Sequence, residues 1–157
     1  MPMRKRPLLP LLLLLGWSLA RPSTSEACSC GELGLEAAAR QAPAVYEVEI
    51  TATHVEAADT PDCKNSQATC VRSRWYEAKV KRVWKGTVPA RVKLLGGPDN
   101  AMCGASPLTG KRWIMFGVVN DDAEHKLHLC DHHLRYRGKD AARLTKLLGK
   151  PKPPVRS

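Results

Sequence analysis

The stretch AVYEVEITATHV, residues 44–55, alternates apolar and polar side chains over most of its length. Its two faces are formed by Tyr46, Val48, Ile50 and Ala52 on one side and by Glu47, Glu49, Thr51 and Thr53 on the other. Successive side chains of a strand point to opposite faces, so this period of two predicts a strand with one face buried and one face in water.

Four further strands are expected after this one. Residues 75–84 alternate in the same way, 90–95 and 126–130 are shorter, and a polar loop at 56–73 separates the first two strands. Residues 113–119 form the most apolar run after the N-terminal region. Such a run is typical of a strand that is buried on both faces, and it predicts the centre of the sheet.

Short helices are expected to flank the strands. Residues 33–41 are rich in Ala, Leu and Glu and end before Pro43. Asp140 is expected to cap a second helix that runs to Leu148. Its apolar stripe consists of Leu144, Leu147 and Leu148. The fold class predicted from these elements is mainly β, a small Greek-key barrel or sandwich of five strands.

The two ends of the chain are expected to lie outside this domain. Residues 1–27 contain a charged start and a short apolar run, as a secretory signal peptide does, and cleavage after Ala20 or after Ala27 fits the small residues there. The apolar run is too short to span a membrane. We therefore expect a secreted, extracellular protein (or a periplasmic one), a domain at 28–148 and a disordered, basic, proline-rich tail at 149–157.

All six cysteines follow the predicted signal peptide: Cys28, Cys30, Cys63, Cys70, Cys103 and Cys130. An even number of cysteines in a small secreted domain predicts disulfide bonds, here three, and leaves most of the pairing open. Cys63 and Cys70 lie in the same polar loop, which suggests that they form one bridge within it. An oxidised, secreted domain of this kind argues against a cytosolic enzyme.

The chain is basic, with a formal net charge of +10 at pH 7. Much of the excess lies between Arg135 and Arg156, and it indicates either a solvated basic face or attraction to an acidic glycan, an anionic surface or an acidic protein. Aromatic residues do not alternate with these charges, so no nucleic-acid partner is expected.

One cluster has residue types that bind metals: His125, His128, Cys130, His132 and His133. On a strand, residues 128, 130 and 132 would share a face, which allows a zinc site. We prefer a disulfide role for Cys130. A Cys–His hydrolase is disfavoured because the cysteines are even in number and no nucleophile motif is present, and Ser106 and Thr109 fit a turn; no enzyme activity is expected.

A known family shares this order of motifs. The segments are Cys28-Ser29-Cys30, the helix and strand to Ile50, Val83-Trp84-Lys85-Gly86, Met102-Cys103-Gly104, 113–119, Leu127-His128-Leu129-Cys130 and the basic helix. Residues 28–148 resemble the N-terminal, netrin-like domain of the tissue inhibitors of metalloproteinases. The resemblance implies a five-stranded barrel of the oligonucleotide/oligosaccharide-binding type (OB-fold), with bridges Cys28–Cys103 and Cys30–Cys130. The family's third bridge is missing and Cys63–Cys70 replaces it.

The resemblance also implies a function. In that family the free α-amino group and the carbonyl oxygen of the first cysteine bind the catalytic zinc of a metalloproteinase. Here those atoms belong to Cys28. The implied protease-contacting residues are Cys28, Ser29, Cys30 and Gly31, together with Ala101, Met102 and Cys103. The only metal is then the zinc of the target protease, no cofactor of the inhibitor's own is expected, and a monomer suffices.

The alternative hypothesis is a secreted netrin-like module that binds an extracellular protein or acidic glycan without inhibiting a protease. Its binding residues would lie on the basic helix: Arg135, Arg137, Lys139, Arg143 and Lys146. Cleavage after Ala20 would favour it, because residues 21–27 would then block the amine of Cys28.

Overall fold

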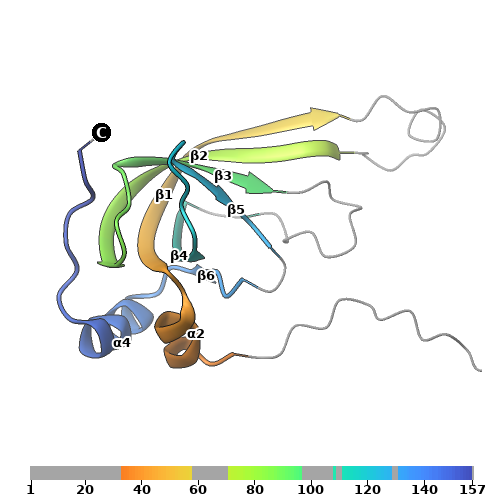
Figure 1. The fold of residues 1–157 in the computed structure, drawn as a ribbon. Coiled ribbons are helices and arrows are strands. Elements are labelled where there is room, and N and C mark those ends of the chain that lie inside the picture. The colour runs from red at the N-terminus through yellow and green to blue at the C-terminus, as the bar shows by residue number, and fades with distance from the viewer. Residues whose placement is uncertain (1–32, 58–70, 97–107, 109–110, 129–130, 157) are drawn as a thin grey trace, which may run out of the picture.

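The computed structural model describes residues 33–57, 71–96, 108, 111–128 and 131–156, and these form a mainly β structure (Figure 1). Its elements are α2 (Leu35–Gln41), β1 (Ala44–Ala57), β2 (Val71–Lys85), β3 (Arg91–Gly96), β4 (Arg112–Gly117), β5 (Glu124–Lys126), β6 (Leu134–Arg135) and α4 (Gly138–Leu148). The predictions of a helix before Pro43 and of strands at β1, β2, β3 and β4 are confirmed. β2 starts earlier than expected, so residues 71–73 belong to a strand and not to the loop.

The strands form one sheet in the order β5-β3-β2-β1-β4-β6. β1 and β2 pair along almost their whole length, from Val45 opposite Lys85 to Ala57 opposite Val71. Every neighbouring pair is antiparallel except β3 and β5, which are parallel. The prediction that 113–119 is the centre of the sheet is wrong, because β4 lies between β1 and the two-residue strand β6.

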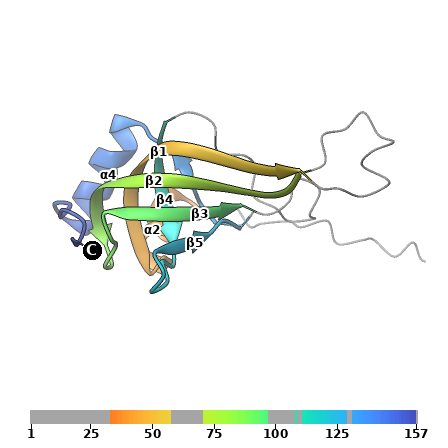
Figure 2. The ribbon, with the colours of Figure 1, turned by 90° about the horizontal axis from the view of Figure 1, so that it is seen from above.

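The sheet has a hydrophobic core on each of its two faces. One core lies on the inner face and includes Tyr46, Val48, Leu94 and Met115. The other packs α2 and α4, which lie together at one end of the sheet in Figures 1 and 2, against residues such as Ile114. β4 is therefore buried on both sides, as its apolar sequence predicted, without being central.

Glu47 is the main exception to the predicted alternation of β1. It was expected on the solvent face, but none of its surface is exposed, because the second core extends over that side of the strand. Arg112 donates two hydrogen bonds to Oε1 of Glu47, one from its Nη2 and one from its Nε at 2.8 Å. The Nε of Arg82 lies 2.5 Å from Oε2 of Glu47. The ring of Tyr136 lies 3.9 Å from the Arg112 guanidinium and 5.8 Å from that of Arg82. This group of four residues is called the Glu47 clamp below.

The C-terminal helix α4 confirms one expectation and corrects another. Leu144 is fully buried, and Leu147 and Leu148 pack against the same cluster, as the apolar stripe predicted. The helix begins at Gly138, its N-cap is Arg137, and no side chain caps it. Asp140 lies instead in the first turn, where a carboxylate interacts favourably with the helix dipole.

The tail was expected to be disordered, but residues 150–156 lie against the sheet. Lys152 and Val83 exchange both backbone hydrogen bonds, at 2.9 and 2.7 Å, and the Val155 N–H donates to the Val88 carbonyl at 3.0 Å. The three prolines of this segment favour an extended backbone.

The fifth strand also differs from expectation. β5 covers Glu124–Lys126, so it overlaps the predicted 126–130 at a single residue. A turn follows it, in which the His128 N–H donates to Asp131 Oδ2 at 3.0 Å and the Asp131 N–H donates to the His128 carbonyl at 3.1 Å. Within the described ranges, neither helix is long and apolar enough to cross a bilayer.

The Glu47 clamp leads to a stability prediction. Replacement of Glu47 by Ala removes the charged hydrogen-bond acceptor that Arg82 and Arg112 share, and because both arginine side chains are partly exposed, we expect the free energy of unfolding to fall by about 1.5–3 kcal/mol. Urea unfolding monitored by tryptophan fluorescence measures the change. The matched control is Glu49→Ala, which removes a carboxylate two residues along that pairs with Lys81 at the surface and should have a much smaller effect. Equal losses in both variants would contradict this role of Glu47.

Candidate functional site

The residues predicted to contact a protease lie outside the described residues. They are Cys28, Ser29, Cys30, Gly31, Ala101, Met102 and Cys103. The other three cysteines also lie outside, so the bridges Cys28–Cys103, Cys30–Cys130 and Cys63–Cys70 stay predictions. The structure does describe residues next to these segments along the chain, among them Leu33, Gly96 and His128.

The described residues before 97–107 and those before 129–130 are neighbours. β3 ends at Gly96, and the carbonyl of Leu95 accepts a hydrogen bond from the Leu127 N–H at 2.8 Å. Gly96, the last described residue before 97–107, therefore follows directly on the residue that is hydrogen-bonded to Leu127. Just after 97–107 in the chain, the N–H of Leu108 donates a hydrogen bond to the Tyr76 hydroxyl at 2.9 Å.

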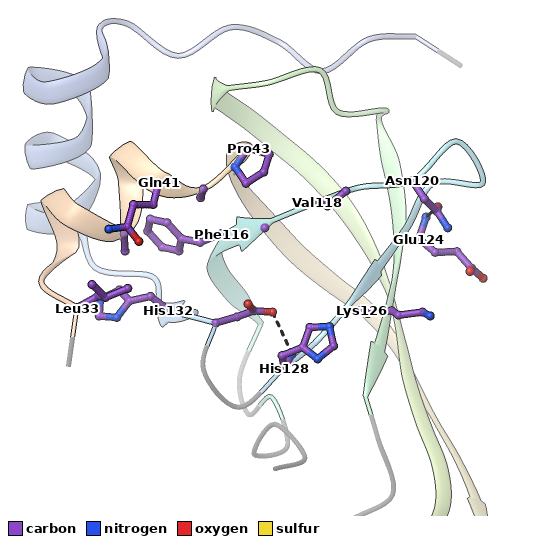
Figure 3. A pocket seen from close by; sticks show the side chains of 14 residues that line it. Leu33, Gln41, Pro43, Phe116, Val118, Asn120, Glu124, Lys126, His128 and His132 are labelled. Carbon is purple, nitrogen blue, oxygen red and sulfur yellow. Dashed lines mark hydrogen bonds between the residues drawn. The ribbon is translucent and has the colours of Figure 1, made fainter. Parts of the chain in front are cut away.

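A pocket of about 600 Å³ lies between α2, the end of β4 and the turn after β5 (Figure 3). Its apolar wall includes Leu33, Pro43 and Phe116. Its polar wall is formed by Gln41, Asn120, Glu124, Lys126, His128, Asp131 and His132. Leu33, the first described residue of the chain, therefore lines the same pocket as the residues on both sides of Cys130.

Behind this pocket, His125, Asp131 and His133 bring one ligand atom each within 4.8 Å of one another. His125 is only 1% exposed, and its Nδ1 is hydrogen-bonded to the Tyr46 hydroxyl at 2.5 Å across the inner face of the sheet. The His133 and His125 rings meet edge to face with centroids 5.2 Å apart, and His133 Nε2 lies 3.5 Å from Asp131 Oδ2. These three residues are called the His-Asp-His cluster.

Burial controls the charge of this cluster. It lowers the pKa of His125 to about 4, with a smaller contribution from the neighbouring His133, so His125 is neutral at pH 7. Burial also raises the pKa of Tyr46, which keeps its phenol protonated. For Asp131, burial favours the neutral acid, but the nearby His133 side chain, 3.5 Å away, and the hydrogen bond from the His128 N–H outweigh it and lower the pKa of its carboxyl group.

The sequence had grouped His125, His128, Cys130, His132 and His133 as a metal-like cluster. From the described part of that set, the structure brings together only His125 and His133, because β5 ends at Lys126 and the expected strand was to continue beyond it. His128 and His132 line the pocket, where the His132 ring lies edge-on to Phe116 at 5.8 Å. Sequence reasoning missed Asp131, whose only local signal is its position two residues before His133.

The basic residues proposed for the alternative function are all exposed: Arg135, Arg137, Lys139, Arg143 and Lys146. Arg143 is engaged by Glu36 of α2, with Nη2 2.5 Å from Oε1. A scan of protein-family models finds no match to this chain, and a search of curated proteins finds none either.

The buried imidazole of His125 predicts a loss of stability in acid. Its pKa is about 4 in the folded protein and 6.5 when exposed, so the unfolded chain takes up the proton first as the pH falls. The contribution is complete above pH 6.5, falls between 6.5 and about 4, and amounts to about 3 kcal/mol. Urea unfolding in the presence of a chelator across this range should show the loss in the wild type and in the exposed control His128→Gln, but not in His125→Gln. An unchanged loss in His125→Gln would contradict the assignment.

Gly117 is predicted to be required by the position of His125. A Cβ at residue 117 would come within 2.8 Å of His125 Cε1 and Nε2, and its φ of +150° is one that other residues rarely adopt. Gly117→Ala should therefore lower the free energy of unfolding by about 1–3 kcal/mol, as overpacking does. Gly138→Ala is the control, because nothing lies within 4 Å of its Cβ position at the start of α4. Thermal unfolding followed by circular dichroism compares the two, and equal midpoints would refute the prediction.

Proposed function

We propose that this protein is a secreted inhibitor of zinc metalloproteinases, and that the N-terminal Cys28, once residues 1–27 are removed, binds the zinc of the protease. A catalytic zinc has three protein ligands and an open position that water occupies. The α-amino group and carbonyl oxygen of Cys28 would replace that water. An α-amino group has a pKa of about 7.7–8.0, so its neutral, donating form is accessible at physiological pH.

The sheet supports the OB-type barrel that this proposal requires. β4 and β5 are at opposite ends of the five-strand order β5-β3-β2-β1-β4, yet His125 of β5 packs against Gly117 of β4. The chain between them also turns tightly, with the Asn120 N–H donating to the Glu124 carbonyl at 2.9 Å. A sheet that curls until its two edges meet is a partly open barrel.

The observation that carries the proposal is that described residues next to the two predicted contact segments lie near the described residues on either side of Cys130. Leu95, two residues before 97–107, accepts a hydrogen bond from the Leu127 N–H. Leu33 lines the same pocket as His128 and Asp131, which flank the position of Cys130. Cys30 precedes Leu33 by three residues, about 10 Å of extended chain. This supports the bridge Cys30–Cys130, which would bring Cys28 toward the segment that holds Cys103.

The proposal predicts an absolute need for a free amine on Cys28. One additional alanine before Cys28 converts the amine into an amide, so inhibition of a panel of zinc metalloproteinases should fall at least about 100-fold, as expected for losing a metal ligand. The inhibition constant is measured after intact mass confirms the N-terminus. The matched control, a Ser substitution at both Cys63 and Cys70, keeps Cys28 and its predicted bridges and should retain inhibition. Full inhibition by the extended variant, or by protein beginning at Arg21, would refute direct zinc binding.

The binding-module alternative is favoured by one observation. Arg135, Arg137, Lys139 and Lys146 are exposed, and within the described ranges no carboxylate pairs with them. If this surface is the functional one, replacing all four by Gln should reduce retention on heparin while the alanine extension leaves it unchanged. If Cys28 is the functional group instead, the alanine extension should abolish protease inhibition, and the variant with four Gln substitutions should inhibit like the wild type.

A further inference from the structure

We propose that the His-Asp-His cluster is a binding site for a divalent transition-metal ion of the protein's own, and that zinc is the ion it fits best. This site is separate from the zinc of a target protease, and it does not depend on the proposed inhibitory function. Two imidazoles and one carboxylate are a ligand set that suits zinc, whereas calcium and magnesium prefer oxygen ligands alone.

The cluster holds buried ligand atoms that lack a close partner. The Nε2 atom of His125 is buried and has no hydrogen-bond partner in the described structure, and the Nε2 atom of His133 has only the long contact of 3.5 Å to Asp131. The side chain of His133 is 6% exposed and His125 is 1% exposed. Buried polar atoms nearly always have a partner, so the unpartnered nitrogen of His125 close to the weakly paired His133 and Asp131 indicates that something binds between them.

Neighbouring residues hold the ligands in position. The Tyr46 hydroxyl is hydrogen-bonded to Nδ1 of His125, which leaves Nε2 as the ring nitrogen that can bind a metal. Asp131 Oδ2 accepts the His128 N–H at 3.0 Å, which fixes the carboxylate. Hydrogen bonds of this kind orient the ligands of metal sites in proteins and select the nitrogen that binds.

Metal binding would require small adjustments. Zinc–nitrogen bonds are about 2.0–2.1 Å long, which puts tetrahedral ligand atoms about 3.3 Å apart, so ligand atoms that now lie within 4.8 Å of one another must approach by up to about 1.5 Å. For Nε2 of His133 to bind the metal, the ring proton would have to be on Nδ1. The Nδ1 atom would then no longer accept the Phe116 N–H, a contact that is 3.5 Å long. Asp131 also lines the pocket, so a water molecule from that side could serve as the fourth ligand.

The consequence for the fold is a connection between distant parts of the chain. His125 belongs to β5, whereas Asp131 and His133 precede β6, which pairs with β4. A metal ion would join these segments at the edge where β4 and β5 approach each other. We assign the site a stabilising role and no catalytic step.

The test uses the full secreted chain without a histidine tag, with free thiols blocked and metal removed by a chelator. Titration with Zn²⁺ should show one ion per chain, Co²⁺ should give the visible absorption of a tetrahedral site, and Zn²⁺ should raise the unfolding midpoint. Asp131→Asn keeps the side-chain size and the acceptor for the His128 N–H. It and His133→Gln should each weaken binding at least about 10–100-fold, because removing a ligand costs no less than removing a supporting residue.

The controls are His128→Gln and His132→Gln, which change histidines of the same segment that line the pocket but lie outside the cluster. Both should bind Zn²⁺ like the wild type. Binding that is lost in the controls but kept in Asp131→Asn and His133→Gln would overturn the assignment in favour of a surface site. Absence of Zn²⁺ and Co²⁺ binding by a folded wild-type chain would also overturn it, and a buried water would then account for the two nitrogens. Near-ultraviolet circular dichroism verifies that each variant is folded.

Discussion

The arrangement of the described strands depends on two neighbouring residues of β1 that are buried on opposite faces of the sheet. Tyr46 extends from the inner face to His125 of β5, and Glu47 extends from the outer face to Arg82 of β2 and Arg112 of β4. Buried polar groups are tolerated only with partners, so each of these contacts restricts where other strands can lie. The first contact brings β5 toward β1 across the sheet, and the second fastens three adjacent strands.

The Glu47 clamp also positions the C-terminal helix. Tyr136 packs on both arginines, and its N–H donates to the Arg112 carbonyl at 3.0 Å, just before α4 begins. The helix then buries Leu144 in the second core together with α2. One buried carboxylate therefore connects the sheet to the layer of helices, and this layer forms one wall of the pocket.

The two proposed metal interactions have different origins. Inhibition would use backbone atoms of Cys28 on the zinc of another protein, and its geometry would depend on the predicted disulfides. The His-Asp-His cluster would bind an ion within this chain, between β5 and the residues that precede β6. An ion there would hold Asp131, the residue next to Cys130, against β5.

The sequence by itself determined the local elements. Alternation predicted β1 and β2, the apolar run predicted that β4 is buried on both sides, and the leucine stripe predicted the buried face of α4. Only the tertiary structure decided which strands are neighbours, why Glu47 is buried, where β5 lies, that residues 150–156 pack on the sheet and that Asp131 joins His125 and His133. Periodicity records the direction of a side chain but not what covers it. Strand order and the His-Asp-His cluster depend on contacts between residues far apart in the chain, which no local pattern encodes.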